Sequence, residues 1–286
     1  MAVSRIGTVV ECRAEVARAR KAGHRIGFVP TMGALHEGHL SLVDEARERS
    51  EWVVLSVFVN PLQFGPGEDL ERYPRDPDRD ARLAAGRGVD LVFEPPLEEM
   101  LSRPLATRVT MRGITDDFEG KARPGHFDGV LTIVTKLFHI VQPDVAVFGQ
   151  KDAQQAAAVR RLVQDLDFPV EIVVVPIVRD LDGVALSSRN LYLSEEERRS
   201  ARSLSQALAA ARSAVEEGER DTGRIERAML DLMEAAPGVA VEYAAVVDPE
   251  QFTRLGRIEG PALAVVAARA GGTRLIDNAV LTPDDG

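Results

Sequence analysis

The first 178 residues alternate between apolar runs of strand length and longer segments with helical periodicity. Runs without polar alternation are typical of strands in a parallel sheet that is covered by helices on both faces. We expect such strands at residues 25–29, 52–59, 89–93, 107–111, 145–148 and 170–178. We expect helices at residues 9–21, 40–46, 78–85, 128–141 and 153–166. This alternation predicts an α/β fold built on a doubly wound parallel sheet with right-handed crossovers.

The pattern changes after residue 178, where helical segments precede a group of strands. Ser194 and Glu197 have the spacing of a capping box at a helix start. The expected elements are helices at residues 195–218 and 225–236 and strands at residues 241–247, 263–268 and 274–278. Because 286 residues are many for a single core, we expect two domains. These are residues 1–178 and a smaller α+β domain of residues 179–286 that closes over the first.

The composition excludes several classes of protein. Apolar residues make up 45% of the chain and charged residues 28%, as in an ordinary soluble globular enzyme. The net charge of −10 argues against nucleic acid or an anionic membrane as the main partner. No apolar run reaches membrane-spanning length, no signal-peptide core is seen, and the single cysteine, Cys12, excludes an internal disulfide. These features favour a protein of the reducing cytoplasm.

Two histidines stand where the first of the expected strands turns into a helix. Residues 30–39 read Pro-Thr-Met-Gly-Ala-Leu-His-Glu-Gly-His, so His36 and His39 are three residues apart. Backbone N–H groups and the helix dipole favour anions at such a turn, phosphates above all. Gly33 and Gly38 let the backbone come close to a ligand, and the imidazoles add directed N–H donors. The stretch therefore predicts a nucleotide site.

Two other interpretations of the histidines are weaker. Zinc ligands at this spacing need a third protein ligand, and no cluster of cysteine and histidine accompanies the pair. An incidental polar residue at a helix start would explain either histidine alone, but it does not explain the pair together with its flanking glycines.

Two further loops carry groups that bind phosphate. Residues 148–152, Phe-Gly-Gln-Lys-Asp, end a strand and open a helix, where Lys151 places a compact positive charge. Residues 186–190, Leu-Ser-Ser-Arg-Asn, offer two hydroxyls and the guanidinium of Arg189. Taken alone, residues 148–152 are equally consistent with a surface lysine near a helix cap. Residues 186–190 alone are equally consistent with a polar turn. Since the carboxyl ends of parallel strands share one edge, we expect these loops and the histidines to converge on one crevice.

Neutral amides fall at the same expected edge. Asn60 and Gln63 follow the second strand, and Gln155 lies one helical turn beyond Lys151. Amide donors orient a carboxylate nucleophile without the ground-state stabilisation that an arginine ion pair gives. The amides therefore suit a carboxylate co-substrate, although Asn60 alone is equally consistent with a role in loop structure.

The connection at residues 61–80 is rich in proline, glycine and charge, which is typical of a functional lid or of disorder. We expect its charged residues to form a solvated surface: Arg75, Asp76, Asp78 and Asp80. Arg123 precedes a helix farther along the chain and is a candidate for a further phosphate-binding cation.

Together these motifs resemble the pantothenate synthetase family, also called pantoate–β-alanine ligase. The shared elements are residues 30–33, 36–39, 58–65, 73–75, 148–152 and 187–190, in order and at the family's spacing. The histidine element also resembles the HIGH signature of the wider nucleotidyltransferase superfamily, and residues 187–189 resemble its mobile phosphate loop. The resemblance covers nearly the whole chain and implies a Rossmann-like first domain with a smaller second one.

The resemblance implies a two-step, AMP-forming ligation of pantoate to β-alanine. ATP and pantoate give pantoyl adenylate and pyrophosphate, with Mg²⁺ neutralising the phosphates, and β-alanine then displaces AMP. Carried onto this chain, the ATP-binding residues are Met32, Gly33, Ala34, Leu35, His36, Glu37, Gly38, His39, Gly149, Gln150, Lys151, Asp152, Val178, Leu186, Ser187, Ser188 and Arg189. The implied catalytic residues are His39 as proton donor, His36, Lys151 and Arg189, and those implied to hold pantoate are Gln63 and Gln155.

The family pattern also bears on metal and assembly. Arg79 interrupts an acidic cluster that is associated with metal in some members, so we assign no metal ligands. The resemblance implies a cytosolic homodimer with small-molecule substrates and neither a nucleic-acid nor a membrane partner. Two rivals stay open. An adenylyltransferase that passes AMP to a phosphate predicts a basic clamp in place of Gln63 and Gln155, and a nucleotide-binding regulator predicts ATP binding without release of pyrophosphate.

Overall fold

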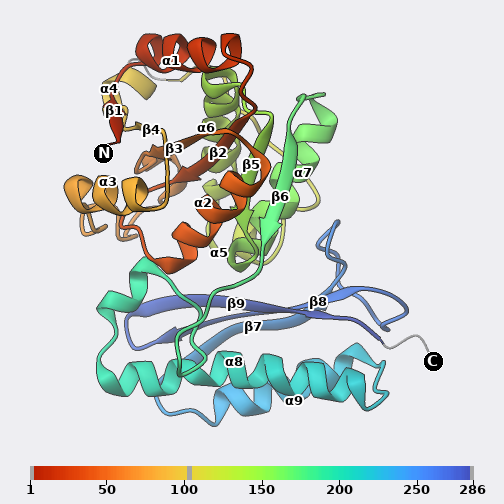
Figure 1. The fold of residues 1–286 in the computed structure, drawn as a ribbon. Helices are drawn as coiled ribbons and strands as arrows, with labels where there is room; N and C mark the ends of the chain where they lie inside the picture. The colour runs from red at the N-terminus through yellow and green to blue at the C-terminus, as the bar shows by residue number, and fades with distance from the viewer. Residues whose placement is uncertain (1–2, 102–104, 284–286) are drawn as a thin grey trace. The chain divides into compact units, whose positions relative to one another are not determined.

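The protein is described by a computed structural model that covers residues 3–101 and 105–283 (Figure 1). The chain divides into two compact units, and each unit contains a sheet of its own. The first unit comprises Met1–Gly149 and Ala158–Pro176, and the second comprises Gln150–Ala157 and Ile177–Gly286. The domain boundary expected between residues 178 and 179 stays a prediction.

The sheet of the first unit has six parallel strands in the order β1-β4-β3-β2-β5-β6. The strands are β1 Ser4–Ile6, β2 Ile26–Thr31, β3 Trp52–Val57, β4 Leu91–Phe93, β5 Val145–Gly149 and β6 Glu171–Val175. In the sheet, β3 and β4 follow β2 on one side, whereas β6 follows β5 on the other side. The strand order therefore reverses between the neighbours β2 and β5. The doubly wound parallel sheet is confirmed. Ligands of such sheets bind at the carboxyl ends of the strands that flank the reversal.

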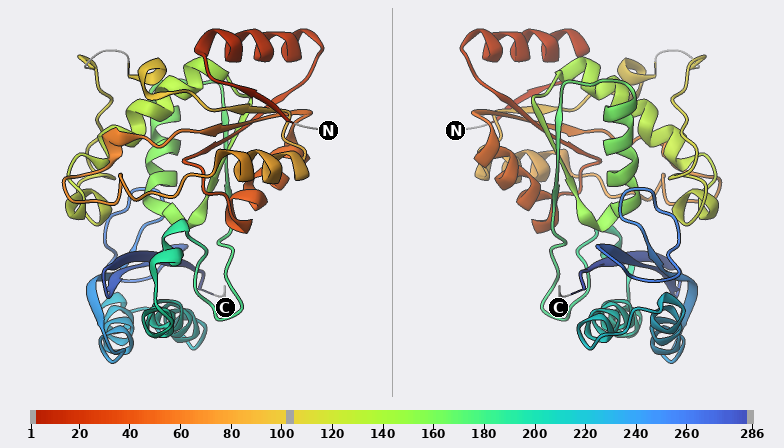
Figure 2. Two further views of the ribbon diagram at one scale, coloured as in Figure 1. Left: turned by 90° about the vertical axis from the view of Figure 1, so that its left-hand side faces the viewer. Right: turned by 90° about the vertical axis from the view of Figure 1, so that its right-hand side faces the viewer.

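Helices cover both faces of this sheet (Figure 2). They are α1 Val9–Lys21, α2 Glu37–Arg49, α3 Pro77–Gly86, α4 Leu97–Met100, α5 Glu119–Ala122, α6 His126–Val141 and α7 Ala153–Asp165. Helices α2 and α3 pack together on one face of the sheet, and α1 and α6 pack together on the other. The inward face of α2 carries Leu42, Val43 and Ala46, and it packs against Val53 and Leu55 of β3.

Two strand predictions for the first unit need correction, and one strand was missed. Residues 107–111 form no strand, because the N–H of Val109 binds the hydroxyl of Thr132 on α6 at 3.0 Å and not a neighbouring strand. Strand β6 ends at Val175, since Pro176 has no N–H to continue the ladder. The edge strand β1 was not anticipated, because its three residues are too few to show a period.

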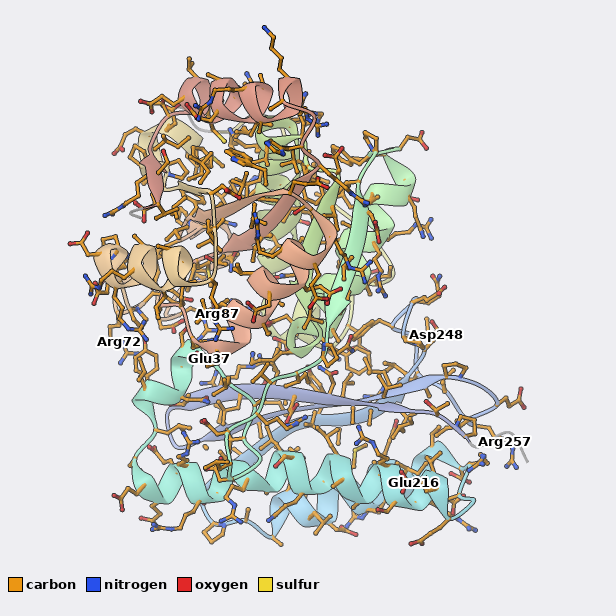
Figure 3. All side chains as sticks on the ribbon, viewed as in Figure 1. Glu37, Arg72, Arg87, Glu216, Asp248 and Arg257 are labelled. Carbon is orange, nitrogen blue, oxygen red and sulfur yellow. The ribbon has the colours of Figure 1, made fainter. Side chains whose placement is uncertain are left out.

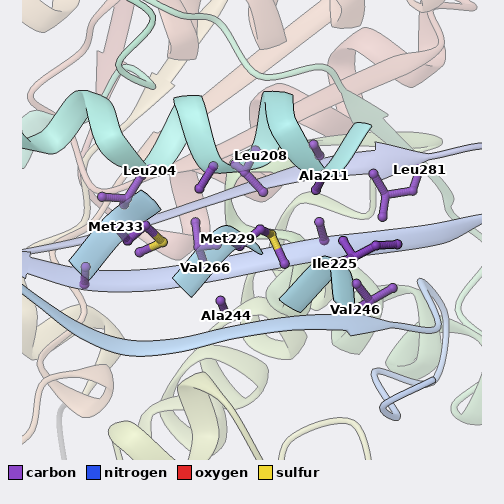
Figure 4. Packing of buried hydrophobic residues seen from close by; sticks show 14 of the residues in the cluster. Leu204, Leu208, Ala211, Ile225, Met229, Met233, Ala244, Val246, Val266 and Leu281 are labelled. Atoms are coloured by element: carbon purple, nitrogen blue, oxygen red, sulfur yellow. The ribbon is translucent and has the colours of Figure 1, made fainter. Parts of the chain in front are cut away.

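The second unit is a three-stranded antiparallel sheet with two helices on one face. Its elements are the helices α8 Glu195–Glu216 and α9 Thr222–Glu234 and the strands β7 Val239–Val247, β8 Ala262–Ala270 and β9 Thr273–Leu281. Apolar side chains of both helices and of the sheet form its core, including Leu208, Met229 and Val266 (Figure 4). The capping box predicted at Ser194 and Glu197 is present at the start of α8.

Candidate functional site

The loop after β2 turns through two consecutive left-handed residues. Gly33 has a φ of +80° and Ala34 has a φ of +51°. A Cβ at Gly33 would lie 2.9 Å from both Asp80 Oδ2 and Val57 Cγ1, so both the conformation and the space require glycine there. Turns of this kind direct successive backbone N–H groups toward one point and bind anions.

The anion in this turn is a side chain of the protein itself. Asp80 Oδ2 accepts a hydrogen bond from the N–H of Ala34 at 2.9 Å, and Oδ1 accepts one from the N–H of Leu35 at 2.8 Å. Asp80 is only 1% exposed, so its prediction as part of a solvated lid surface is wrong. A phosphate cradle at this loop would have to use donors other than these two N–H groups.

The burial of Asp80 follows from its place in helix α3. Asp76 caps this helix by accepting a hydrogen bond from the N–H of Arg79 at 3.0 Å. Counted from that cap, Asp80 shares the inward face with Ala81 and Ala84, which are also buried. The other charged residues of the expected surface are exposed: Arg75, Asp76 and Asp78. The helical period of residues 77–86 was therefore the signal that could have placed Asp80 inside.

The two histidines lie against each other at the start of α2. Their ring centroids are 4.1 Å apart, and the ring planes are inclined by 37°. His36 is the N-cap residue of α2, and both imidazoles are half-buried. Glu37 lies between them in the chain but pairs with Arg87 at 2.6 Å, and Figure 3 shows the two side chains side by side. The structure therefore brings the two imidazoles together and directs the intervening carboxylate elsewhere.

The amides follow β3 in the short 3₁₀ helix η1 Pro61–Gln63, of which Asn60 is the N-cap residue and Gln63 the last residue. Asn60 is 2% exposed, and its Oδ1 accepts a hydrogen bond from the N–H of Leu62 at 3.0 Å. Its Nδ2 lies 3.1 Å from both Gln63 Oε1 and the carbonyl oxygen of Gly129. Asn60 thus maintains the loop structure. Gln63 Nε2 lies 3.1 Å from Met32 Sδ, which links this loop to the loop of the histidines.

Two side chains at the start of α6 hold the main chain of Gln63. Arg123 Nη2 at 3.2 Å and His126 Nδ1 at 2.9 Å both bind its carbonyl oxygen. A carbonyl only accepts, so His126 carries its proton on Nδ1, and its Nε2 accepts from Arg123 Nη1 at 3.0 Å. Burial, and next the charge of Arg123, lower the pKa of His126 to about 4. This imidazole is therefore neutral near pH 7.

Arg123, a candidate for phosphate binding, is bound instead to a carboxylate of the connection at residues 61–80. Its Nε and Nη2 lie 2.8 and 2.7 Å from the two oxygens of Glu68. Burial raises the pKa of Glu68, but the hydrogen bonds and charge of Arg123 outweigh it and hold the pKa below its ordinary value. A Cβ at Gly129 would lie 2.3 Å from the carbonyl oxygen of Leu62, so α6 packs directly on η1. Glu68 and Gln63 are thus tied to the same end of α6.

Lys151 lies in the second unit, in the 3₁₀ turn η2 Gln150–Asp152. Its Nζ is 3.8 Å from Asp152 Oδ2, and its side chain is 22% exposed. Gln155, half-buried, follows in the first turn of α7. The carbonyl oxygens of Gln150 and Lys151 accept hydrogen bonds from Asn278 of β9 at 2.9 and 3.0 Å. No feature of the sequence pointed to Asn278.

The loop with the two serines also belongs to the second unit. The N–H of Leu186 binds the carbonyl oxygen of Val178 at 2.9 Å and so closes the intervening residues into a loop. Ser187 Oγ accepts from the N–H of Arg189 at 3.3 Å at the start of the 3₁₀ helix η3 Ser188–Tyr192. Ser188 is buried, and Arg189 is half-buried. Val178, Leu186 and the serine–arginine turn therefore form one local structure.

The expected site residues thus fall into two sets, one in each unit. The first set is residues 32–39, Gln63 and Gly149, and the second is residues 150–152, Gln155, Val178 and residues 186–189. Their convergence on one crevice stays a prediction. Besides Asn278, the sequence left the buried roles of Asp80 and His126 unrecognised.

The described part of the chain contains neither a cluster of metal ligands nor a membrane-spanning helix. Within residues 3–101 and 105–283, no group of three or more His, Cys, Asp or Glu side chains is placed to hold a metal ion. Over the same two ranges, no helix is both long enough and apolar enough to cross a membrane.

Known proteins similar to this chain share both its length and its fold. The family model described as pantoate–β-alanine ligase matches residues 4–280. A protein of Pelotomaculum thermopropionicum named pantothenate synthetase is 51% identical over 274 residues, which cover 96% of this chain and 97% of that protein. A protein of Moorella thermoacetica with the same name is 52% identical over 278 residues, which cover 97% of this chain and 98% of that protein.

Solved structures of proteins with the same names share the fold of this chain. The crystal structure of pantothenate synthetase from Thermus thermophilus is 50% identical, covers 97% of this chain and 99% of its own, and superimposes with a TM-score of 0.92. The crystal structure of pantoate–β-alanine ligase from Francisella tularensis, described as complexed with β,γ ATP and β-alanine, is 30% identical with a TM-score of 0.81. It covers 100% of this chain and 99% of its own.

Proposed function

This chain belongs to the pantoate–β-alanine ligase family, and on that premise we propose that it acts through an enzyme-bound pantoyl adenylate. The enzyme joins pantoate to β-alanine and consumes ATP, so the bond that it forms is a C–N bond. In the first step a carboxylate oxygen of pantoate attacks the α-phosphorus of ATP, and pyrophosphate leaves. In the second step the amine of β-alanine attacks the acyl carbon and loses a proton, and AMP leaves to give pantothenate.

One observation supports this mechanism above the others. Two imidazoles, His36 and His39, lie with centroids 4.1 Å apart at the start of α2, at the carboxyl edge of a parallel sheet. Negative charge builds on the phosphates as the carboxylate attacks, and preorganised N–H donors at that place stabilise it. The imidazoles supply such donors without a guanidinium that would compete for the pantoate carboxylate.

The proposed ATP site uses residues of both units. In the first unit these are Met32, Gly33, Ala34, Leu35, His36, Glu37, Gly38, His39 and Gly149, and in the second they are Gln150, Lys151, Asp152, Val178, Leu186, Ser187, Ser188 and Arg189. Within this set His39 donates a proton, while His36, Lys151 and Arg189 neutralise charge on the departing pyrophosphate. The loop of residues 33–35 acts here through its shape, because Asp80 already binds two of its N–H groups.

Gln63 and Gln155 are proposed to hold pantoate by neutral amide contacts. Gln63 is suited to this task because its main chain is fixed by Arg123 and His126 and its side chain by Asn60. An acceptor carboxylate held by amides keeps more of its basicity than one paired with a cation. An adenylyltransferase that transfers AMP to a phosphate would need cations at these positions.

Mg²⁺ is proposed to enter as the complex with ATP. The described residues offer no cluster of metal ligands, and the buried carboxylate of Asp80 is already bound by two N–H groups. These residues therefore suit an ion that is held mainly by phosphate oxygens and water, as is usual for Mg²⁺ at nucleotide sites. The metal would neutralise the phosphates, while His36, His39 and Lys151 orient them.

The test is an exchange reaction between ATP and labelled pyrophosphate. Exchange should require pantoate and proceed without β-alanine, because only the adenylation step is reversed. Exchange that ignores pantoate would contradict the pantoyl adenylate, and a regulator without turnover would show ATP binding but no exchange.

We expect His39→Ala and Lys151→Ala each to lower kcat by a factor of about 10²–10³, as with the loss of one charge-stabilising donor. The matched controls are His24→Ala and Lys21→Ala, which change the same residue types at exposed positions near the amino end of β2. Both controls should keep the kcat of the parent chain. Unchanged turnover in the His39 and Lys151 variants would remove these residues from the mechanism.

We further propose that the enzyme is a cytoplasmic homodimer, as its family resemblance implies. Sedimentation equilibrium should give twice the mass of the chain, and a monomer across the concentration range would contradict the dimer. Fractionation of cells that express the chain should recover it with the cytoplasmic proteins.

A further inference from the structure

The turn that carries Lys151 follows β5 in the chain but is bound by a strand near the other end of the sequence. Residues Gln150–Ala157 belong to the second compact unit, although β5, which precedes them, belongs to the first. Their partner is β9, the last strand of the second unit. The position of Lys151 is therefore set by contacts within the second unit.

Asn278 of β9 makes these contacts with every polar group of its side chain. Its Nδ2 donates to the carbonyl oxygens of Gln150 at 2.9 Å and Lys151 at 3.0 Å. Its Oδ1 accepts from Gln150 Nε2 at 3.1 Å. Asn278 is only 3% exposed, so water has little access to these bonds. An amide that is buried and fully bonded in this way fixes the turn closely.

The residue before it, Asp277, holds the second phosphate-binding loop. Its Oδ2 and Oδ1 accept from Arg179 Nη1 at 2.6 Å and Nη2 at 2.9 Å, and Asp277 is 4% exposed. Arg179 also donates to the carbonyl oxygen of Gly183 at 3.1 Å and forms a β-bridge with Ala185. The loop that leads into Leu186 is thus anchored on the same strand.

The two anchors are joined within β9. The N–H of Asn278 donates to Asp277 Oδ1 at 2.8 Å, the same oxygen that binds Arg179. One pair of adjacent residues therefore sets both the turn of Lys151 and the start of the loop that carries Arg189. Both loops contribute cations to the proposed phosphate site.

We propose that Asn278 is a positioning residue for Lys151, and that Asp277 with Arg179 fixes the Leu186–Arg189 loop on the same strand. This inference rests on the proposed function, since it assigns Lys151 to the phosphates. A lysine whose main chain is fixed loses less conformational freedom when it meets the phosphates, and it meets them in the geometry that the reaction needs. Asn278 touches no substrate and acts through Lys151.

A purely structural role for Asn278 makes a different prediction. If the amide serves only to stabilise the fold, its removal lowers the population of folded enzyme and does so equally whatever residue stands at position 151. If it positions Lys151, its removal matters only while the lysine is present. A double-mutant cycle separates the two cases.

The experiment measures kcat and KM for ATP in pantoate-dependent pyrophosphate exchange for the parent chain, Asn278→Ala, Lys151→Ala and the double variant. We expect Asn278→Ala to lower kcat ~10- to 100-fold, the size of effect that a small misplacement of a reacting group produces. In the Lys151→Ala background the same change should lower kcat less than about twofold, because no lysine remains to be misplaced.

Leu281→Ala on the same strand is the matched control, because Leu281 is fully buried in the core of the second unit and its apolar side chain cannot hydrogen-bond to either loop. It should lower the melting temperature yet keep kcat near the parent value at a temperature well below the transition. Should Asn278→Ala fail to fold, Asn278→Ser, whose hydroxyl keeps one donor, enters the same cycle with a smaller expected loss.

The outcomes separate the inference from the function on which it rests. If Lys151→Ala turns over like the parent chain, the proposed role of the lysine is wrong, and the inference fails with it. If Lys151→Ala is slow but Asn278→Ala multiplies the loss in both backgrounds, only the positioning role is overturned. A loss of kcat on Asn278→Ala that occurs only when Lys151 is present supports the positioning role.

Discussion

The carboxylate of Asp80 occupies a turn in which the sequence predicted a phosphate. It binds the N–H groups of Ala34 and Leu35 at 2.9 and 2.8 Å from a position 1% exposed. Because carboxylates and phosphates use the same donors, an internal anion can form the loop before any nucleotide arrives. The backbone that leads into His36 is therefore preorganised by the protein itself.

A second residue-scale feature, the neutral imidazole of His126, predicts how stability depends on pH. Its pKa is about 4 in the folded chain and ordinarily 6.5, so between these values the unfolded chain takes up a proton that the folded chain does not. The free energy of unfolding should therefore fall as the pH is lowered from 6.5 toward 4. With ~1.4 kcal/mol per pH unit, His126 contributes on the order of 2 kcal/mol of this fall.

The measurement compares urea unfolding of the parent chain and of His126→Asn at several pH values above 4.5. This range avoids the titration of Glu68, which pairs with Arg123 beside His126 and whose pKa is lowered from 4.5. Asparagine keeps an N–H for the carbonyl oxygen of Gln63 but takes up no proton, so the variant should show a flatter pH dependence. Equal slopes for the two proteins would contradict the neutral buried imidazole.

At the scale of elements, the start of helix α8 is fixed by a reciprocal pair of hydrogen bonds. Ser194 Oγ accepts from the N–H of Glu197 at 3.2 Å, and the N–H of Ser194 donates to Glu197 Oε2 at 2.8 Å. These bonds satisfy N–H groups that the first helical turn cannot pair internally. They also set where α8 begins after the loop of Arg189, and α8 supplies much of the core of the second unit.

We predict that Ser194→Ala lowers the free energy of unfolding by about 1 kcal/mol, the usual cost of losing an N-cap side chain. The control is Ser205→Ala, the same change in the interior of α8, where the hydroxyl of Ser205 donates to the carbonyl oxygen of Arg202 at 3.0 Å. That variant should lie within about 0.5 kcal/mol of the parent chain. If urea titrations give the same loss in the free energy of unfolding for both variants, the N-cap side chain does not stabilise α8 as proposed.

For the molecule as a whole, helix α7 runs across the division between the two units. It begins in the segment Gln150–Ala157 of the second unit and ends in the segment Ala158–Pro176 of the first. One continuous helix therefore has residues in both units. Because its backbone hydrogen bonds run across the division, we expect the two units to unfold together.

The prediction is tested with Leu208→Ala, which removes a side chain that is 2% exposed from the core of the second unit. This change should lower the free energy of unfolding by about 2–5 kcal/mol. Trp52, the single tryptophan, lies on β3 of the first unit, so its fluorescence reports on that unit, whereas ellipticity reports on both. Both signals should shift to the same lower urea midpoint. The control is Leu232→Ala, at a position 42% exposed on α9, which should change neither the fluorescence midpoint nor the ellipticity midpoint by much.

A fluorescence midpoint that stays at the parent value while the ellipticity transition splits would mean that the units unfold independently. In that case α7 would break at the division between the units.

The sequence by itself determined most of the longer elements and the class of fold. Unbroken apolar runs predicted the strands of the parallel sheet, and the period of 3.6 residues predicted the longer helices. The spacing of Ser194 and Glu197 predicted the capping box of α8. The same reasoning located the histidine pair, because a strand-to-helix turn with flanking glycines is a local pattern. It failed for residues 107–111, where a side chain of α6 takes the place of a strand partner.

Only the tertiary structure decided what holds the candidate site in place. Asp80 binds Ala34 across 46 positions of sequence, and Asn278 binds Lys151 across 127. No local period encodes such a pairing, because it depends on which loops the packed sheets bring together. A buried carboxylate or amide is stable only where donors and acceptors meet it, and those partners exist only once the chain has folded.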